Sequence, residues 1–364
     1  MPWLKKIIKH VFAILFGIFL AMVILEIVLR IWHPFKYTVR GDKIILAANI
    51  KVAMKNKWIR KLDDTIYYSR NSIGLRGDEW PADPEKYITV ITVGGSTTEC
   101  KFLSDNKTWP EHLKQDLEKN YAHIWLNNAG LDGHSTFGHL ILLKDYIVRL
   151  HPKYILFLVG TNDVELDRPA DLDDQDIRGI HMHSGKYFFK SLFNYSETGT
   201  LLLSLYRNYL AYKKGLVHTE RSPVELAPGV TDTLTRNRKL ALQQNYLGNY
   251  AGRLRELAAI CVNQGIKPVF ITQPALFGNV MDSTTMIFMG NRILDGYDCA
   301  TDWEILQLYN DEVRKLRAAG VAVIDLAAAM PKDSKYYYDF MHYTNAGAEK
   351  LASILADSLR LIIK

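Results

Sequence analysis

The sequence is poor in cysteine. Its 364 residues include three, an odd number that allows at most one internal disulfide, and their spacing fits no zinc site. We therefore expect Cys100, Cys261 and Cys299 to be small buried apolar side chains. Internal repeats and low-complexity tracts are also lacking, and a content of 48% hydrophobic and 23% charged residues argues against a disordered chain.

A concentrated basic patch is lacking as well. The formal net charge is +6, but Lys and Arg are scattered, and no basic run is interleaved with aromatic residues. This distribution argues against nucleic-acid binding. Part of the positive excess lies near the N-terminus, where Lys5, Lys6 and Lys9 precede an apolar run.

That apolar run extends from Val11 to Leu29, and its one charged residue is Glu26. Nineteen helical residues span about 28 Å, close to the thickness of a bilayer core. Arg30 and Trp32 follow, as anchors at a membrane interface would. The alternatives are a buried core helix and a cleaved signal peptide, but the residues after the run make a poor cleavage site. We expect residues 1–32 to form a cytoplasmic stub and an uncleaved transmembrane anchor.

After a connecting segment at 33–86, β-branched and apolar runs alternate with helical patterns. This order predicts an α/β fold with a parallel sheet covered by helices on both faces. We expect one domain at 87–364, interrupted by an insertion at 164–236. The predicted strands are 87–93, 124–128, 154–159, 267–272 and 321–325. The predicted helices are 109–120, 137–150, 238–263, 302–318 and a last one that starts near Thr344.

The insertion at 164–236 has weak periodicity and is interpreted as a lid or a substrate wall beside the strand ends. Its acidic run lacks the glycine-containing spacing of a calcium loop, so we interpret it as a solvated loop. His181 and His183 are assigned no metal, and Gly185-Lys186 is not a phosphate loop. The acidic residues are Asp167, Asp171, Asp173, Asp174 and Asp176.

The first predicted strand ends in Gly94-Gly95-Ser96. Glycine allows an abrupt turn and close approach of other groups. A serine at the end of a buried strand lies at the rim of the sheet, which suits a nucleophile that a base can reach. The alternative is an ordinary turn in which Ser96 caps the next helix.

Two other predicted strands also end in turns with glycine and polar residues, at Gly133 and at Asn162. Ligands bind outside the carboxyl ends of parallel strands, so Ser96, Gly133 and Asn162 are expected at one rim. Asp339 and His342 precede the last helix, and their three-residue spacing allows direct contact. A serine nucleophile needs a histidine base, which in turn needs a carboxylate. Taken singly, each motif is common as a turn or a surface pair.

These motifs together resemble the SGNH family of the GDSL esterase/lipase superfamily, from about residue 66 to the C-terminus except the insertion. The family's four blocks match Gly94–Thr98, Asn128–Gly133, Gly160–Asp163 and Asp339–His342. Two positions depart from the usual Gly-Asp-Ser-Leu, with Gly95 in place of Asp and Thr97 in place of Leu. The chain has no Gly-x-Ser-x-Gly elbow, the mark of another serine hydrolase type.

The resemblance implies a three-layer sandwich around a doubly wound, five-stranded, flavodoxin-like sheet. It implies that Ser96 attacks an ester carbonyl, that His342 accepts and returns the proton, and that Asp339 orients His342. The backbone N–H groups of Ser96 and Gly133 and the side-chain amide of Asn162 would hold the oxyanion. No metal or organic cofactor is implied.

The expected function is a serine esterase that acts through an acyl-enzyme. Its substrate would be an acyl ester, such as an acetyl group on a cell-surface glycan or lipid. The lysines before the apolar run favour a single-pass protein of the cell membrane, with the catalytic domain in the periplasm or outside the cell. The alternatives are an O-acyltransferase with the same residues and a catalytically silent glycan-binding protein.

Overall fold

The computed structural model describes residues 2–32, 39–40, 43–44, 46–167, 195–213 and 218–363. These residues divide into two compact units. One comprises Met1–Ala47 and Asp176–Val217, and the other comprises Ala48–Gln175 and His218–Lys364. We describe each unit by itself. The domain limits expected from the sequence remain predictions.

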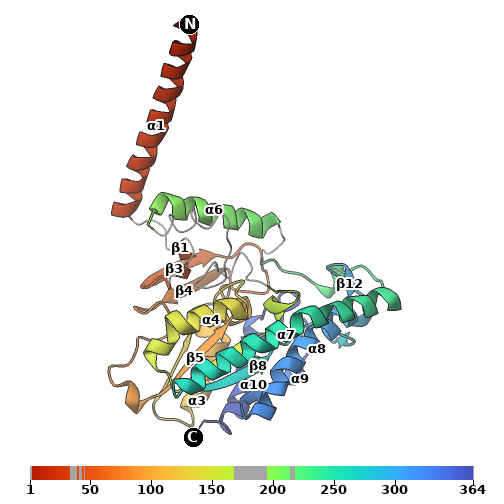
Figure 1. The fold of residues 1–364 in the computed structure, drawn as a ribbon. Helices are drawn as coiled ribbons and strands as arrows, with labels where there is room; N and C mark the ends of the chain where they lie inside the picture. The colour runs from red at the N-terminus through yellow and green to blue at the C-terminus, as the bar shows by residue number, and fades with distance from the viewer. Residues whose placement is uncertain are drawn as a thin grey trace. The chain divides into compact units, whose positions relative to one another are not determined.

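A five-stranded parallel sheet forms the centre of the larger unit (Figure 1). Numbered along the chain, the strands have the spatial order 2-1-3-4-5 of flavodoxin-like folds. The predicted fold is thus confirmed, and each strand end lies within two residues of its predicted position. The strands are β5 (Ile88–Gly94), β6 (Ile124–Asn128), β7 (Tyr154–Val159), β8 (Lys267–Thr272) and β13 (Ala322–Ile324).

Helices cover both faces of this sheet, as predicted. One face carries α3 (Trp109–Glu118), α9 (Leu326–Ala329) and α10 (Asn345–Leu359). The other face carries α4 (Thr136–Asp145), α7 (Thr233–Asn263) and α8 (Cys299–Lys315).

Several helix limits differ from the predicted ones. Helix α7 starts five residues early because Asp232 accepts the N–H of Thr235 as its N-cap. Helix α8 starts three residues early because Asp298 accepts the N–H of Thr301 in the same way. The predicted helix at 137–150 ends at Asp145 and is followed by a 3₁₀ turn at Ile147–Leu150.

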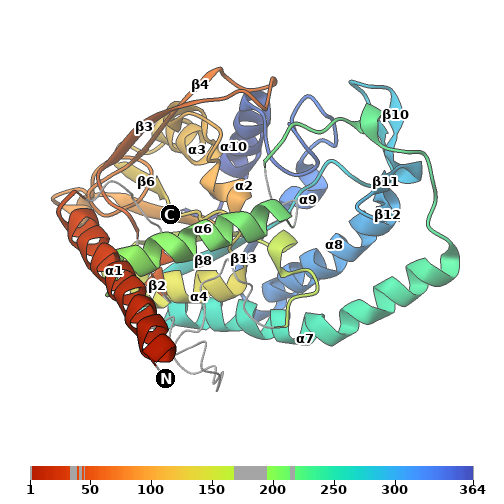
Figure 2. The ribbon, with the colours of Figure 1, turned by 90° about the horizontal axis from the view of Figure 1, so that it is seen from above.

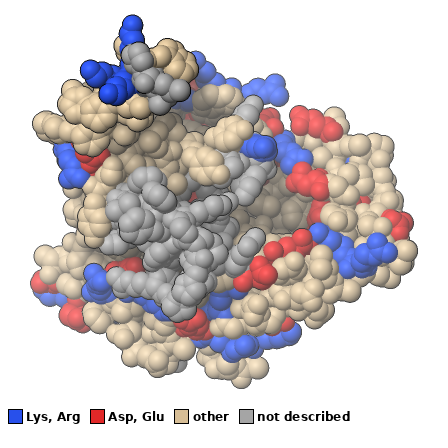
Figure 3. All heavy atoms as spheres, turned by 45° about the horizontal axis from the view of Figure 1, so that its top comes forward, with Lys and Arg blue, Asp and Glu red and all other residues tan. Residues whose placement is uncertain are grey.

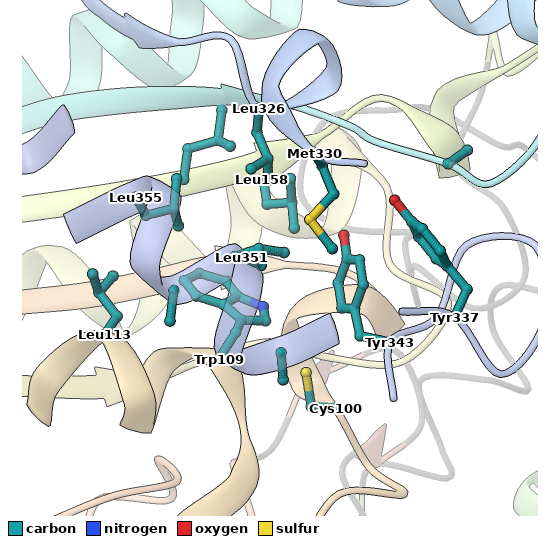
Figure 4. Close-up of a cluster of buried hydrophobic side chains, with 14 of the residues drawn as sticks. Cys100, Trp109, Leu113, Leu158, Leu326, Met330, Tyr337, Tyr343, Leu351 and Leu355 are labelled. Atoms are coloured by element: carbon teal, nitrogen blue, oxygen red, sulfur yellow. The ribbon is translucent and has the colours of Figure 1, made fainter. Parts of the chain in front are cut away.

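A large cluster of buried hydrophobic side chains lies between the sheet and helices α3 and α10 (Figure 4). Figure 4 shows Trp109 of α3 beside Leu351 of α10, with Leu158 of β7 in the same cluster. Side chains alternate along β7, so Phe157 points to the opposite face and stacks on Phe270 of β8 with ring centroids 4.9 Å apart. Cys100, Cys261 and Cys299 are free and buried, as expected.

Two parts of the larger unit were not predicted as structure. Strands β3 (Ile50–Lys55) and β4 (Thr65–Arg70) pair antiparallel within the segment expected only to connect. Residues 281–298 contain two small hairpins, built from β9 (Met281–Asp282) with β10 (Ile287–Phe288) and from β11 (Ile293–Leu294) with β12 (Tyr297–Asp298). Helix α2 (Ser96–Glu99) is a single turn at the end of β5.

The smaller unit contains α1 (Pro2–Trp32), the short pair β1 (Val39–Arg40) and β2 (Lys43–Ile44), and α6 (Glu197–Lys213). Within α1, Lys5–Trp32 is long and apolar enough to cross a membrane. No helix was predicted within the insertion at 164–236, where α6 lies. Its buried first turn is built from small polar residues and carries one charge, so the contrast between its faces is weak in the sequence.

Several predicted features of the insertion lie outside the described residues. These are the acidic positions from Asp171 to Asp176, His181, His183 and Gly185-Lys186. Charges of both signs are interspersed over the face drawn in Figure 3, where blue side chains also gather at the top of the view. This pattern agrees with the scattered basic residues of the sequence.

Candidate active site

The predicted nucleophile lies where strand β5 meets helix α2. β5 ends at Gly94, Gly95 is the N-cap residue of α2, and Ser96 is the first residue of that helix. The alternative that Ser96 caps a helix is therefore wrong. Gly95 has no room for a side chain, because a Cβ atom there would lie 2.4 Å from Nδ2 of Asn162.

Ser96, His342 and Asp339 form one hydrogen-bonded chain. Nε2 of His342 lies 2.8 Å from Oγ of Ser96, and Nδ1 of His342 lies 2.6 Å from Oδ2 of Asp339. An ionised carboxylate only accepts, so Nδ1 of His342 carries the hydrogen and Nε2 is free to accept the serine proton. All three side chains are largely shielded from solvent, with Ser96 9% exposed.

Local hydrogen bonds fix the turn that carries Asp339 and His342. Oδ1 of Asp339 accepts the backbone N–H of Met341 at 2.8 Å and that of His342 at 2.7 Å. Aspartate closes turns in this way. The three-residue spacing therefore uses both carboxylate oxygens, one to hold the turn and one to hold the imidazole.

Burial and charge act against each other in this pair. Burial raises the pKa of the Asp339 carboxyl, but the charge of His342 and the hydrogen bonds to Asp339 lower it more, and the net pKa lies below its usual value. Burial lowers the pKa of His342, but the charge and hydrogen bond of Asp339, with the charge of Asp132, outweigh it. The net pKa of His342 lies above its ordinary 6.5.

The predicted oxyanion donors lie around the same turn. Nδ2 of Asn162 donates one hydrogen to the carbonyl of His134 at 2.9 Å, and the amide keeps a second hydrogen. A Cβ atom on Gly95 would also lie 3.1 Å from that carbonyl, so the loop at Gly133 and His134 touches the Ser96 turn. Gly133 has φ of 74°, a left-handed conformation that favours glycine. Within the described residues, its N–H has no recorded acceptor.

Metal ligands are not gathered at this site. Among the residues that the structure describes, no group of three or more His, Cys, Asp or Glu side chains could hold a metal ion.

A family model described as the GDSL-like lipase/acylhydrolase family matches residues 91–350. The chain belongs to this family. It is therefore a hydrolase that acts on ester bonds, and the resemblance drawn from the four motifs is confirmed.

Solved structures with a similar fold include three hydrolases. A GDSL-like lipase from Bacteroides thetaiotaomicron has 12% identity and a TM-score of 0.39, over 79% of this chain and 93% of that one. An acetylxylan esterase from Geobacillus stearothermophilus has 13% identity and a TM-score of 0.41, over 74% and 93%. A hydrolase from the metagenome of Lake Arreo has 12% identity and a TM-score of 0.43, over 76% and 96%. A search of curated proteins finds no match.

Asp163, the last residue of the Gly-x-Asn-Asp motif, has a structural position in this GDSL-like hydrolase. Its buried carboxylate accepts the N–H of Thr136 at 3.1 Å and lies 3.2 Å from Nη2 of Arg253 in α7. Two adjacent residues of the motif therefore have different roles. Asn162 faces the Ser96 turn, while Asp163 ties the end of β7 to α4 and α7.

Glu99, the last residue of α2, connects the nucleophile turn of the hydrolase to strand β4 and to the loop before Gly133. Its Oε1 accepts the hydroxyl of Tyr68 at 2.9 Å and lies 3.2 Å from Nη2 of Arg70, and its Oε2 accepts the N–H of Asp132 at 2.7 Å. One carboxylate therefore holds both α2 and the residue before Gly133. No sequence motif indicates this role of Glu99.

A second imidazole, that of His218, lies against His342, and no sequence motif indicates this contact. The ring centroids of His218 and His342 are 4.3 Å apart. Nδ1 of His218 lies 2.7 Å from the hydroxyl oxygen of Tyr338, and Nε2 lies 3.3 Å from Oδ1 of Asp132. Burial raises the pKa of Asp132, but the hydrogen bond and charge of His218, with other nearby charges, lower it to about 2. An anion therefore lies next to the loop of Gly133 and raises the pKa of His342.

Proposed function

We propose that the hydrolase works through a Ser96–His342–Asp339 triad and an acyl-enzyme. The observation that carries the proposal is the continuous hydrogen-bonded chain, with 2.8 Å between Ser96 and His342 and 2.6 Å between His342 and Asp339. A serine hydroxyl is a poor nucleophile at neutral pH and needs such a base.

In the first half-reaction, Oγ of Ser96 attacks the ester carbonyl carbon while Nε2 of His342 takes its proton. Asp339 stabilises the imidazolium that forms. The carbonyl oxygen becomes an oxyanion and accepts hydrogen bonds from the N–H groups of Ser96 and Gly133 and from the free N–H of Asn162. The bond to the alcohol oxygen then breaks, and the alcohol leaves with the proton from Nε2.

Water completes the cycle. His342 removes a proton from the water as its oxygen attacks the acyl carbon, and the same donors hold the second oxyanion. Collapse of this intermediate breaks the bond to Oγ, releases the carboxylic acid and returns the proton to Ser96.

The proposed setting is the outer side of a cell membrane, with α1 as the anchor. Lys5–Trp32 has the length and composition of a membrane span, and Lys5, Lys6 and Lys9 lie at its start. Positive residues favour the cytoplasmic side, which leaves the hydrolase unit outside. The proposed substrate is an acyl ester on an extracytoplasmic glycan or lipid.

The test is made on the full chain in detergent micelles. A fluorescent organophosphonate should label Ser96 in a tetrahedral adduct, and p-nitrophenyl esters of increasing acyl length should identify the preferred acyl group. Ser96→Ala should remove both labelling and turnover, while Ser72→Ala, an exposed serine, should change neither. Labelling of folded Ser96→Ala at another serine would overturn the triad.

A further inference from the structure

Helix α6 carries an apolar stripe that is open to solvent. Leu202, Leu205, Tyr206 and Tyr209 follow the spacing i, i+3, i+4 and i+7, which places them on one helical face. Their exposed fractions lie between 56% and 58%. A contiguous apolar face of this kind marks a surface that contacts a partner or a membrane.

The start of α6 is fixed to the candidate membrane helix. Oε1 of Glu26 accepts the N–H of Glu197 at 3.0 Å, and Oε2 accepts the N–H of Thr198 and the hydroxyl of Ser196, both at 2.9 Å. The carboxylate of α1 thus adds two backbone hydrogen bonds to the one that the Ser196 hydroxyl accepts from the N–H of Gly199 at 2.9 Å, and it faces the positive end of the α6 dipole.

Arg30 strengthens this junction from the next turn of α1. Its Nε lies 2.8 Å from Oε1 of Glu26, and its Nη2 donates to the carbonyl of Tyr195. The one charged residue of the apolar run is therefore engaged in holding a second helix.

The position of the junction along α1 sets the depth of α6. Glu26 precedes the end of the candidate span at Trp32 by six residues, about 9 Å along a helix. That distance lies within the boundary layer between acyl chains and headgroups. Figures 1 and 2 show α6 leading away from the α1 axis, starting beside the C-terminal part of α1.

We propose that α6 lies in the interfacial layer of the bilayer that α1 spans, with its Leu and Tyr stripe against lipid. The inference rests on the membrane anchor of the proposed function. Tyrosine is enriched at this depth because its ring is apolar and its hydroxyl reaches water. Apolar side chains of α1 are also exposed near the junction, at Ile27, Val28 and Ile31. These two features favour lipid as the occupant over a second protein.

The experiment uses the full chain in phosphatidylcholine vesicles. The native cysteines are buried, so a fluorescent thiol label reports on an introduced one. Three variants are compared: Leu205→Cys in α6, Phe16→Cys within α1, and Leu361→Cys, an exposed leucine near the C-terminus. Each label is exposed to lipids that carry a spin-label quencher at a shallow or a deep position.

We expect the Leu205 label to be quenched more by the shallow lipid, the Phe16 label more by the deep lipid, and the Leu361 label by neither. A quenched Phe16 label with an unquenched Leu205 label would overturn the α6 proposal and leave the anchor standing. Quenching at neither site would overturn the anchor itself. A Leu205 signal that depends on protein concentration and not on the lipid would assign the stripe to a second copy and also overturn the proposal.

The junction is tested with Glu26→Leu, which removes the carboxylate that accepts the N–H groups of Glu197 and Thr198 and keeps α1 apolar. Quenching at Leu205 should fall severalfold while quenching at Phe16 stays unchanged. Equal quenching at Leu205 with and without Glu26 would overturn the role of Glu26 in setting the depth of α6.

Discussion

At the residue scale, the charge of His342 decides when the proposed mechanism can run. The base must be neutral to accept the Ser96 proton, so activity falls as His342 protonates. The pKa of His342 is raised mainly by Asp339 against the opposing effect of burial. We therefore expect the acid limb of kcat/KM to lie above pH 6.5, the ordinary value for histidine. A pH–rate profile with a short p-nitrophenyl ester measures it.

The same profile tests the anion beside the second imidazole. Asp132 also raises the pKa of His342, so Asp132→Asn should move the acid limb to lower pH. Asp339, His218 and Tyr338, which also lie against His342, remain in place. Asp357→Asn, which removes an exposed carboxylate from α10, is the control and should leave the limb unchanged. An unmoved limb in Asp132→Asn would show that this carboxylate does not act on the base.

Asn162 provides a prediction about rate alone. Its amide uses one hydrogen on His134, and the other is proposed to hold the oxyanion. Asn162→Ala should lower kcat by about a hundred- to thousand-fold, or about 2.7–4 kcal/mol of transition-state stabilisation, with the melting temperature nearly unchanged. A loss of less than a few-fold in the folded variant would remove Asn162 from the mechanism.

At the scale of elements, Asp163, the residue after Asn162, is expected to contribute to stability and not to the rate. Asp163→Ala should destabilise the protein by about 3–5 kcal/mol, because it leaves Arg253 buried without its partner. The exposed pair of Asp357 and Arg360 is a matched control, and Asp357→Ala should cost about 0–1 kcal/mol. Urea unfolding of the three proteins gives the comparison. Equal unfolding midpoints for the two variants would contradict the structural role of Asp163.

The strands and the residues at their ends could be predicted from the sequence. β7 is apolar at every position because helices cover both of its faces, and such a run stands out between turn residues. Asp339 and His342 are three residues apart on one turn, so their contact follows from local geometry. The contact of His342 with Ser96 could be predicted only from the need of a serine nucleophile for a histidine base and from the family resemblance, since His342 does not end a strand.

The supporting residues could not be predicted, because their partners are distant in the sequence. Arg70 lies 29 positions from Glu99, on a strand taken for part of a connection. Asp132 lies 86 positions from His218, which falls inside the expected insertion. No periodicity or motif links such residues, since only the tertiary fold brings them together. Helix α6 was missed for a different reason, because its buried first turn consists mainly of small polar residues.

At the scale of the whole molecule, the chain joins an esterase unit to a unit that contains a candidate membrane span. Helix α1 stays in the mature protein if it is a membrane anchor and is removed if it is a signal peptide. The junction of Glu26 with α6 exists only while α1 stays attached, because cleavage would remove the carboxylate that accepts the N–H groups of Glu197 and Thr198. This contact is a reason beyond hydrophobicity to expect an uncleaved helix.

We therefore predict that the protein isolated from cells keeps residues 2–30 and stays in the membrane fraction after alkaline carbonate washing. Carbonate removes proteins bound at a surface, whereas a helix of Lys5–Trp32 that spans the bilayer resists it. Mass spectrometry of the purified chain gives the N-terminus. As a matched variant, Leu20→Arg with Val23→Arg places two charges within the span and should release the protein into the wash, at about 2.5–3.5 kcal/mol per charge. A mature N-terminus after residue 30 would instead identify a signal peptide, and the hydrolase unit would then be free of the membrane.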